Sequence, residues 1–199
     1  MTNKLISWIS GALLVVAFSS QLHAVEESAL SSELEKRIGL IMELLKDKAM
    51  PKEQRDVKMI DAVEDLFDFK LMARLSLGKT VWSPLNKAQK EAFTDIFITR
   101  LKRSYLEKMY LYTDEDVEVK PVVKNSAKRI SVPAYILDTK GKTELIYKFY
   151  KSKKSGWLLY DLEVEGVSFI QTYRTQFAGI LKESTFDELV ERLKTSEPL

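Results

Sequence analysis

A series of four apolar, β-type segments joined by very short links constrains the fold of this chain more than any other feature. The segments are rich in Val, Ile, Tyr and Phe, as strands usually are, and they cover residues 117–124, 129–137, 142–150 and 156–164. Turn-forming residues join them at Asn125-Ser126, at Lys140-Gly141 and over the polar residues 152–155. Because parallel strands need long crossover connections, links this short predict an antiparallel meander of four strands.

Helical patterns lie on both sides of these strands. Before them, apolar residues recur at helical spacing over four segments, which cover 27–48, a stretch that begins at Pro51, 69–77, and 87 to about 111. After them, the helical period returns from Ser168 and again from Thr185, with Glu165-Gly166 as the turn before the first of these. The order of helices, strands and helices predicts an α+β domain in which helices pack against a curved four-stranded antiparallel sheet.

Polar residues and glycine predict where these helices begin and end. Four polar residues are followed three positions later by Glu or Gln, which is the pattern of a capping box; they are Ser32, Asn86, Ser168 and Thr185. Gly78 is the expected C-terminal cap of the 69–77 segment. The expected buried stripes are Val57, Ile60, Val63 and Leu66 in the second helix, and Phe93, Ile96, Phe97, Leu101, Tyr105 and Met109 in the long one.

The first 24 residues have the layout of a secretory signal peptide. One lysine near the start precedes an apolar run from Leu5 to Phe18, and a small residue, Ala24, stands at the expected cleavage position. The run is short for a membrane-spanning helix, and an uncleaved N-terminal anchor is the alternative. We therefore expect residues 1–24 to be removed and residues 25–199 to form a single exported domain.

The composition argues against several classes of protein. The chain contains no cysteine, and its one histidine, His23, lies in the predicted signal peptide. Thiol catalysis, histidine-based triads and the usual zinc sites are therefore not expected, and neither is a cofactor that needs a Gly-rich phosphate loop. Without residues 1–24 the chain carries 30 Lys and Arg against 29 Asp and Glu. This near-neutral balance argues against a nucleic-acid partner.

Carboxylates are the remaining candidates for catalysis. Asp161, Glu163 and Glu165 lie two apart, so they would share one face of a strand and could act as general acids or bases. We favour a solvated face, or ion pairs with Lys and Arg, because deeply perturbed carboxylates are uncommon. The basic run at 151–154 indicates a solvated hairpin tip, with contact to an anionic membrane or partner as the alternative.

The last three predicted strands carry apolar side chains on both faces. In the last one, Leu158, Tyr160, Leu162 and Val164 would lie on one face, with Trp157 and Leu159 opposite. An antiparallel sheet with one face in water should alternate more cleanly. The pattern by itself favours a dry core covered by helices, and an apolar cavity for a ligand is the alternative.

Two blocks of residues carry a family resemblance. The C-terminal block is Gly156-Trp157, Tyr160-Asp161-Leu162, Glu165-Gly166-Val167-Ser168, Tyr173-Arg174, Gln176-Phe177 and Leu181. The helical block is Phe69, Ala73-Arg74, Leu77-Gly78, Trp82, Gln89, Phe93, Phe97, Leu101 and Tyr105. In this order and at this separation, the two blocks resemble the MlaC family, also called the toluene-tolerance protein family, over most of residues 28–195.

The resemblance implies a function as well as a fold. Members of the family are periplasmic phospholipid-binding shuttles between an outer-membrane lipoprotein complex and an inner-membrane ABC transporter complex, and they maintain outer-membrane lipid asymmetry. Acyl chains insert between the sheet and its helices, so an apolar cavity is expected there. Such a carrier needs no catalytic residue, since each buried CH₂ contributes about 0.8 kcal/mol. We expect a monomer that is not an enzyme.

The residues expected to contact the acyl chains lie on the inward faces of strands and helices. They are Phe97, Leu101, Val132, Ala134, Ile136, Leu145, Tyr147, Phe149, Tyr160, Leu162, Val167 and Ile170. Arg174 is expected to form an ion pair with a buried carboxylate, or to approach a head-group phosphate. Two alternatives stay open: a carrier for another apolar ligand such as a hopanoid, and an enzyme on a cone-shaped α+β fold with Asp161 or Glu163 as base.

Overall fold

The computed structural model describes residues 26–111, 115–139 and 141–195, so the predicted signal peptide lies outside the described residues. Within them, no helix is long and apolar enough to cross a membrane. The helices are η1 (Glu27–Ala29), α1 (Leu30–Lys46), α2 (Lys52–Asp61), η2 (Glu64–Leu66), α3 (Phe69–Leu77), α4 (Lys79–Trp82), α5 (Lys87–Met109), α6 (Phe169–Ile180) and α7 (Phe186–Lys194). The strands are β1 (Asp116–Val119), β2 (Val123–Ser126), β3 (Arg129–Asp138), β4 (Gly141–Ser152), β5 (Gly156–Val164) and β6 (Val167–Ser168).

The sheet is antiparallel, as expected, but the prediction of four strands is wrong. Among the described residues it has six strands, in the order β1-β3-β4-β5-β6, with β2 also paired to β3. The single strand predicted over 117–124 is two strands, because Pro121 lacks the N–H that would continue the ladder. The two-residue strand β6 follows β5 through Glu165-Gly166, whose φ angles of 49° and 76° fit a tight hairpin turn.

Most of the predicted helix caps are confirmed. Asn86 and Gln89 form a reciprocal capping box at α5, and Thr185 and Glu188 form one at α7. Ser168 caps α6 by accepting a hydrogen bond from the backbone N–H of Gln171.

The prediction at Ser32 is wrong. Helix α1 already begins at Leu30, after η1, and has no side-chain cap. Burial of Leu30 and Leu34 against the sheet outweighs the local capping signal.

The stripe predicted for the second helix is confirmed only in part, because Val63 and Leu66 are buried but lie beyond the end of α2. Val57 is 59% exposed, and the buried residues of α2 are Arg55 and Met59. Helix α2 ends at Asp61, so the residues that follow, up to Leu66 in η2, do not continue its face. In contrast, α5 has the predicted length and buries three of the predicted residues, which are Phe93, Phe97 and Leu101.

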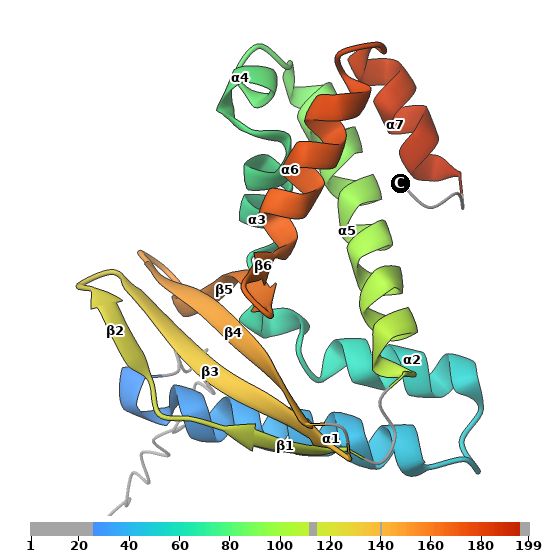
Figure 1. Ribbon diagram of the computed structural model, residues 1–199. Coiled ribbons are helices and arrows are strands. Elements are labelled where there is room, and N and C mark those ends of the chain that lie inside the picture. Colours follow the sequence, from blue (N-terminus) through green and yellow to red (C-terminus); the bar gives the residue numbers. More distant parts are fainter. Residues whose placement is uncertain (1–25, 112–114, 140, 196–199) are drawn as a thin grey trace, which may run out of the picture.

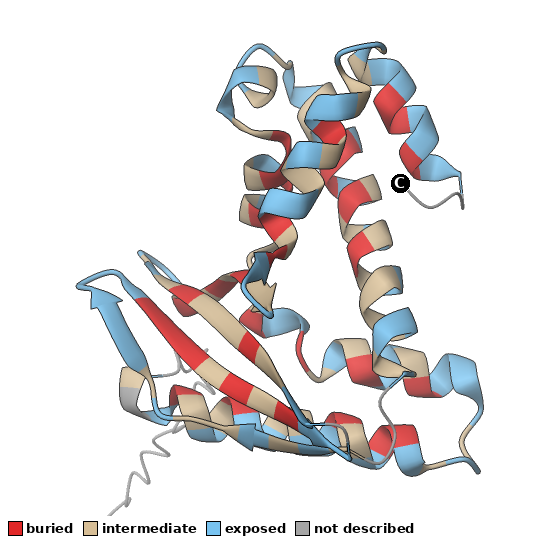
Figure 2. Cartoon of the chain, in the orientation of Figure 1, coloured by how far each residue is buried: buried red, intermediate tan, exposed pale blue. Residues whose placement is uncertain are grey.

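The molecule has a sheet part and a helical part, and α5 connects them. Helix α1 lies along one face of the sheet, and α2 lies near α1 (Figure 1). Helices α3, α4, α6 and α7 stand together at the top of the view (Figure 1). Buried residues follow β3 and the facing sides of α3, α5 and α6 (Figure 2). Phe93, Phe97 and Phe177 are in the helical core, Leu30, Ile130 and Phe149 in the α1–sheet core, and Ile41, Leu45 and Met59 in the α1–α2–α5 core. Phe67, just before α3, packs against all three of these cores. The hydrophobic interior is therefore divided into clusters around a central space.

Candidate functional site

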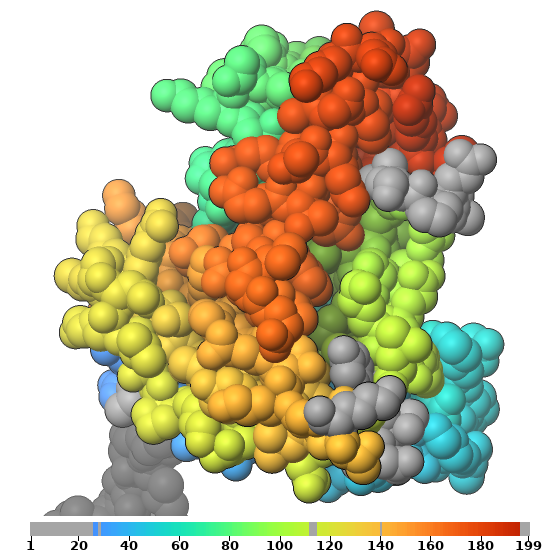
Figure 3. Space-filling model, viewed as in Figure 1, coloured from blue at the N-terminus to red at the C-terminus, as the bar shows by residue number. Residues whose placement is uncertain are grey.

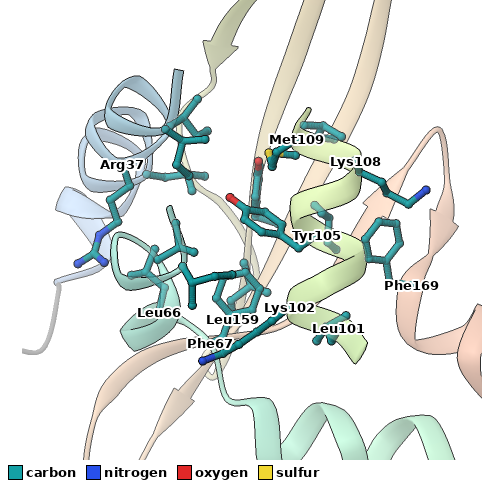
Figure 4. Close-up of a pocket in the computed structure, with 18 of the residues that line it drawn as sticks. Arg37, Leu66, Phe67, Leu101, Lys102, Tyr105, Lys108, Met109, Leu159 and Phe169 are labelled. Carbon is teal, nitrogen blue, oxygen red and sulfur yellow. The ribbon is translucent and has the colours of Figure 1, made fainter. Parts of the chain in front are cut away.

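A cavity of about 320 Å³ occupies this central space. This volume lies within the range of small-molecule binding sites, about 300–1,000 Å³. Its wall comes from α1, the α2–α3 segment, α5 and the inner face of the sheet (Figure 4). The space-filling view shows a hollow between β6 and α5 (Figure 3). Residues of this wall include Leu34, Ile38, Ile41, Met42, Phe67, Leu101, Tyr105, Met109, Ile136, Leu145, Tyr147, Leu159, Leu162, Val164 and Phe169.

Helical periodicity explains why α1 and α5 present apolar walls. On α5, Leu101, Tyr105 and Met109 are four residues apart, so they lie on the same helix face. On α1, Leu34, Ile38 and Ile41 are four and three residues apart, so they also share one helix face. The two helices therefore face the cavity with stripes of large side chains.

A bulge in β5 determines which of its side chains face the cavity. Phe149 on β4 pairs with Leu159, and Lys148 pairs with Asp161, so Tyr160 is an extra residue in the ladder. Leu159 and Leu162 therefore both line the cavity, although residues three apart would point to opposite faces of a regular strand. The expectation that Tyr160 and Leu162 share a face, opposite Leu159, is wrong because it assumes an unbroken alternation.

Five of the twelve residues expected to contact acyl chains line the cavity. They are Leu101, Ile136, Leu145, Tyr147 and Leu162. The other seven do not line it. Phe97 and Ile170 are in the helical core, Val132 and Phe149 are in the α1–sheet core, and Ala134 is buried in one cluster with Ile136 and Leu145. Val167 is 59% exposed, and Tyr160 packs on Tyr150 at the outer face of the sheet. Contact with a lipid stays a prediction for all twelve.

Sequence reasoning missed most of the wall that the helices supply. The α1 stripe and the lower half of α5, including Tyr105 and Met109, line the cavity. Both appeared only as helical stripes, which indicate burial but not what is buried against them. Phe67 carried no signal, because it lies between two helices.

Two tyrosines place polar groups inside this apolar wall. Tyr105 on α5 and Tyr147 on β4 are both only partly buried, and both line the cavity. Burial raises the pKa of Tyr147 to about 12. Burial and, second, the neighbouring phenol of Tyr147 raise the pKa of Tyr105. Both phenols are therefore neutral at physiological pH.

Two basic residues of the described cavity wall are held in ion pairs. Arg37 pairs with Glu33 and Asp65, and Lys102 on α5 pairs with Glu64 at 2.6 Å. The side chains of Arg37 and Lys102 extend away from the apolar centre (Figure 4).

A further lysine of the cavity wall, Lys108, is not part of these ion pairs. Lys108 is exposed, forms no ion pair with a described residue, and lies beside Phe169 (Figure 4). It is a positive charge available to an anionic group at the cavity edge.

The candidate catalytic carboxylates lie outside the cavity. Asp161 is 6% exposed and accepts hydrogen bonds from the Ser168 hydroxyl at 2.7 Å and the Ile170 backbone N–H at 3.1 Å. Glu163 pairs with Lys148, whose Nζ also lies 3.8 Å from Asp161 Oδ2. The interpretation as ion pairs with lysine is confirmed for Asp161 and Glu163, whereas Glu165 accepts a hydrogen bond from the Glu144 backbone N–H. Asp161 additionally holds the N-terminus of α6.

Metal-ligating groups are not gathered within the described part of the chain. No group of three or more His, Cys, Asp or Glu residues there could hold an ion.

Arg174 forms no ion pair with a carboxylate of the described residues, and its approach to a head-group phosphate stays a prediction. Its Nε and one Nη donate hydrogen bonds of 3.0 and 2.7 Å to the carbonyl oxygen of Leu75. That carbonyl is in the last turn of α3, where the helix itself offers no N–H partner. The guanidinium also lies 3.7 Å from the position of a Cβ at Gly78, so the small residue leaves room for it.

Comparison with known proteins agrees with this architecture. The model of the MlaC protein family matches residues 35–195. Among solved structures, a phospholipid-binding protein from Ralstonia solanacearum, in complex with a phospholipid, superimposes with a TM-score of 0.70. The match covers 82% of this chain and 94% of that one, at 22% sequence identity.

Proposed function

Because the chain belongs to the MlaC protein family, we propose that it is a carrier that binds a phospholipid in the cavity between α5 and the sheet. The single observation that carries the proposal is the apolar wall of this cavity, which spans α1, α5 and strands β3 to β5. The solved structure from Ralstonia solanacearum, which has the same fold, holds a phospholipid and supports the choice of ligand. Family and fold point to a lipid carrier rather than an enzyme.

The energetics of the cavity fit a lipid with a charged head group. Each acyl CH₂ moved from water into the cavity contributes about 0.8 kcal/mol. Burying the charged head group would cost far more than this, so it stays at the cavity edge in water. Lys108 lies at that edge and would be near an anionic head group.

The proposed route runs across the periplasm. The carrier would exchange phospholipid with an outer-membrane lipoprotein complex and an inner-membrane ABC transporter complex as a monomer, and so maintain outer-membrane lipid asymmetry. Export would depend on the predicted signal peptide at 1–24, and N-terminal sequencing of protein from a periplasmic fraction tests its removal. Recovery in the cytoplasmic fraction with residue 1 retained would contradict this part of the proposal.

A transfer assay between vesicles tests the carrier function. Donor vesicles contain a fluorescent phospholipid with a quencher, and acceptor vesicles contain neither. The purified protein without its first 24 residues should accelerate the gain of fluorescence in proportion to its concentration. An unchanged rate would contradict the proposal.

A further inference from the structure

The inside of the cavity carries two hydroxyl groups that the fold does not use. Among residues 26–111, 115–139 and 141–195, neither Tyr105 nor Tyr147 has a hydrogen-bond partner for its phenol. No buried side-chain oxygen or nitrogen atom of the described residues lacks a partner. The two phenol oxygens are therefore not fully buried. Because both residues line the cavity, the oxygens are exposed to the space inside it. Figure 4 shows the Tyr105 hydroxyl pointing from α5 into it.

The two phenols come from opposite walls. Tyr105 packs with the α1–α2–α5 core, whereas Tyr147 packs with the side chains of the sheet. They are close enough for the Tyr147 phenol to contribute to the raised pKa of Tyr105. A ligand that fills the space between α5 and β4 passes both hydroxyls.

The surroundings of these hydroxyls are apolar. Met42, Met109 and Leu145 line the same cavity. A hydroxyl held against hydrocarbon without a partner costs about 1–3 kcal/mol, so a bound ligand should offer it an acceptor. Pure hydrocarbon chains cannot do so.

A diacyl phospholipid brings one kind of neutral acceptor to this depth. Its acyl chains have no acceptor, and its charged phosphate stays at the water-facing edge because burial of charge is costly. The ester carbonyls lie between the two, and they are neutral and accept hydrogen bonds. Neutral phenols are suitable donors to them, since a phenol O–H is both a donor and an acceptor.

We infer that Tyr105 and Tyr147 form a subsite for the ester carbonyls of a diacyl lipid, donating hydrogen bonds to them from α5 and β4. The inference rests on the proposed function and adds a chemical preference to it. The cavity then distinguishes ester-linked lipids from ether-linked lipids of the same length, because the ether lacks the carbonyl oxygen. Each hydrogen bond should favour the ester by about two- to tenfold.

A competition between two lipids tests this subsite. The protein without residues 1–24, stripped of bound lipid, is incubated with vesicles that hold equal amounts of two phosphatidylglycerols with identical chains, one ester-linked and one ether-linked. The protein is recovered and its bound lipids are quantified by mass spectrometry. The ratio of the two lipids is measured within one sample, so partial loss of folded protein does not change it.

The wild-type protein and two variants complete the test. The wild-type protein should favour the ester several-fold, and the Tyr105→Phe, Tyr147→Phe double variant should bind both lipids in nearly equal amounts. Tyr160→Phe is the matched control on the outer face of the sheet, and it should retain the wild-type ratio.

Two failures are distinguishable. A wild-type ratio of one, or a ratio that the double variant retains, overturns the subsite and leaves the proposed function intact. Binding of neither lipid by the wild-type protein overturns both.

Discussion

Arg174 on α6 donates two hydrogen bonds, of 3.0 and 2.7 Å, to the carbonyl oxygen of Leu75 on α3. The contact joins segments that are 99 residues apart. A charged donor thereby satisfies a carbonyl at the C-terminal end of a helix, which also suits the helix dipole. The helical part above the cavity is thus held by a polar contact in addition to its aromatic core.

Replacing Arg174 should destabilise this helical part. Arg174→Met keeps most of the apolar stem but removes both hydrogen bonds, so the free energy of unfolding should fall by about 1.5–3 kcal/mol. Urea unfolding measured by circular dichroism checks this. The exposed Lys182→Met is the control and should change stability by less than about 0.5 kcal/mol. Equal stabilities for both variants would show that the contact contributes nothing.

Asp161 should matter for stability through its hydrogen bonds at the start of α6. Asp161→Asn places an amide where the carboxylate accepts from Ser168 and Ile170, and the expected loss is about 1–3 kcal/mol. Glu163→Gln, which disturbs only the more exposed pair with Lys148, should cost less than about 1 kcal/mol. Thermal unfolding of the two variants compares them, and the reverse order would contradict the assignment.

Filling the cavity should reduce lipid binding without a comparable loss of stability. Leu162→Trp adds volume on the cavity side of β5, whereas Leu158→Trp adds the same volume at a position paired with Tyr150 on the outer face. Lipid recovered with purified protein should fall at least several-fold in the first variant and stay unchanged in the second. If both variants retain lipid equally, the ligand lies elsewhere.

The raised pKa of the Tyr147 phenol predicts a loss of stability at high pH. The pKa of Tyr147 is raised from 10.0 in the unfolded chain to about 12 in the folded protein, because burial disfavours the phenolate. The folded state therefore holds its proton more tightly, and stability that is present below pH 10 is lost as pH rises toward 12, by about 1.4 kcal/mol per pH unit for such a group.

Tyr147→Phe tests this directly. The variant should lose stability less steeply than the wild type between pH 10 and 12, while Tyr160→Phe should follow the wild type. Urea unfolding at a series of alkaline pH values measures both slopes. Parallel curves for wild type and Tyr147→Phe would contradict the raised pKa of this phenol.

Local signals predicted much of the fold. The caps at Asn86 and Thr185 are correct because each needs only residues three positions apart in the chain. The inward face of β3, with Ile136 on the cavity, also follows from simple alternation. The start of α1 was not predictable in this way, since burial of Leu30 against the sheet is a tertiary contact.

The site was harder to predict than the fold. The bulge at Tyr160 reverses the alternation within β5, and the sequence pattern contains no sign of it. The partner of Arg174 is the backbone carbonyl of Leu75 on α3, which is 99 residues away in the sequence. Residue types alone cannot reveal such a partner. An apolar stripe has the same pattern whether it faces other side chains, as Phe97 does, or an open cavity, as Tyr105 does.

Mass spectrometry of an organic extract from the purified protein, expressed with residues 1–24 in a Gram-negative host, tests whether the cavity holds a phospholipid. We expect phospholipid in a fixed molar proportion to protein, reduced in Leu162→Trp and unchanged in Leu158→Trp. Absence of phospholipid from the wild-type extract, together with no uptake from vesicles, would contradict it. An extract that contained a different apolar molecule, such as a hopanoid, would replace phospholipid as the ligand of this cavity.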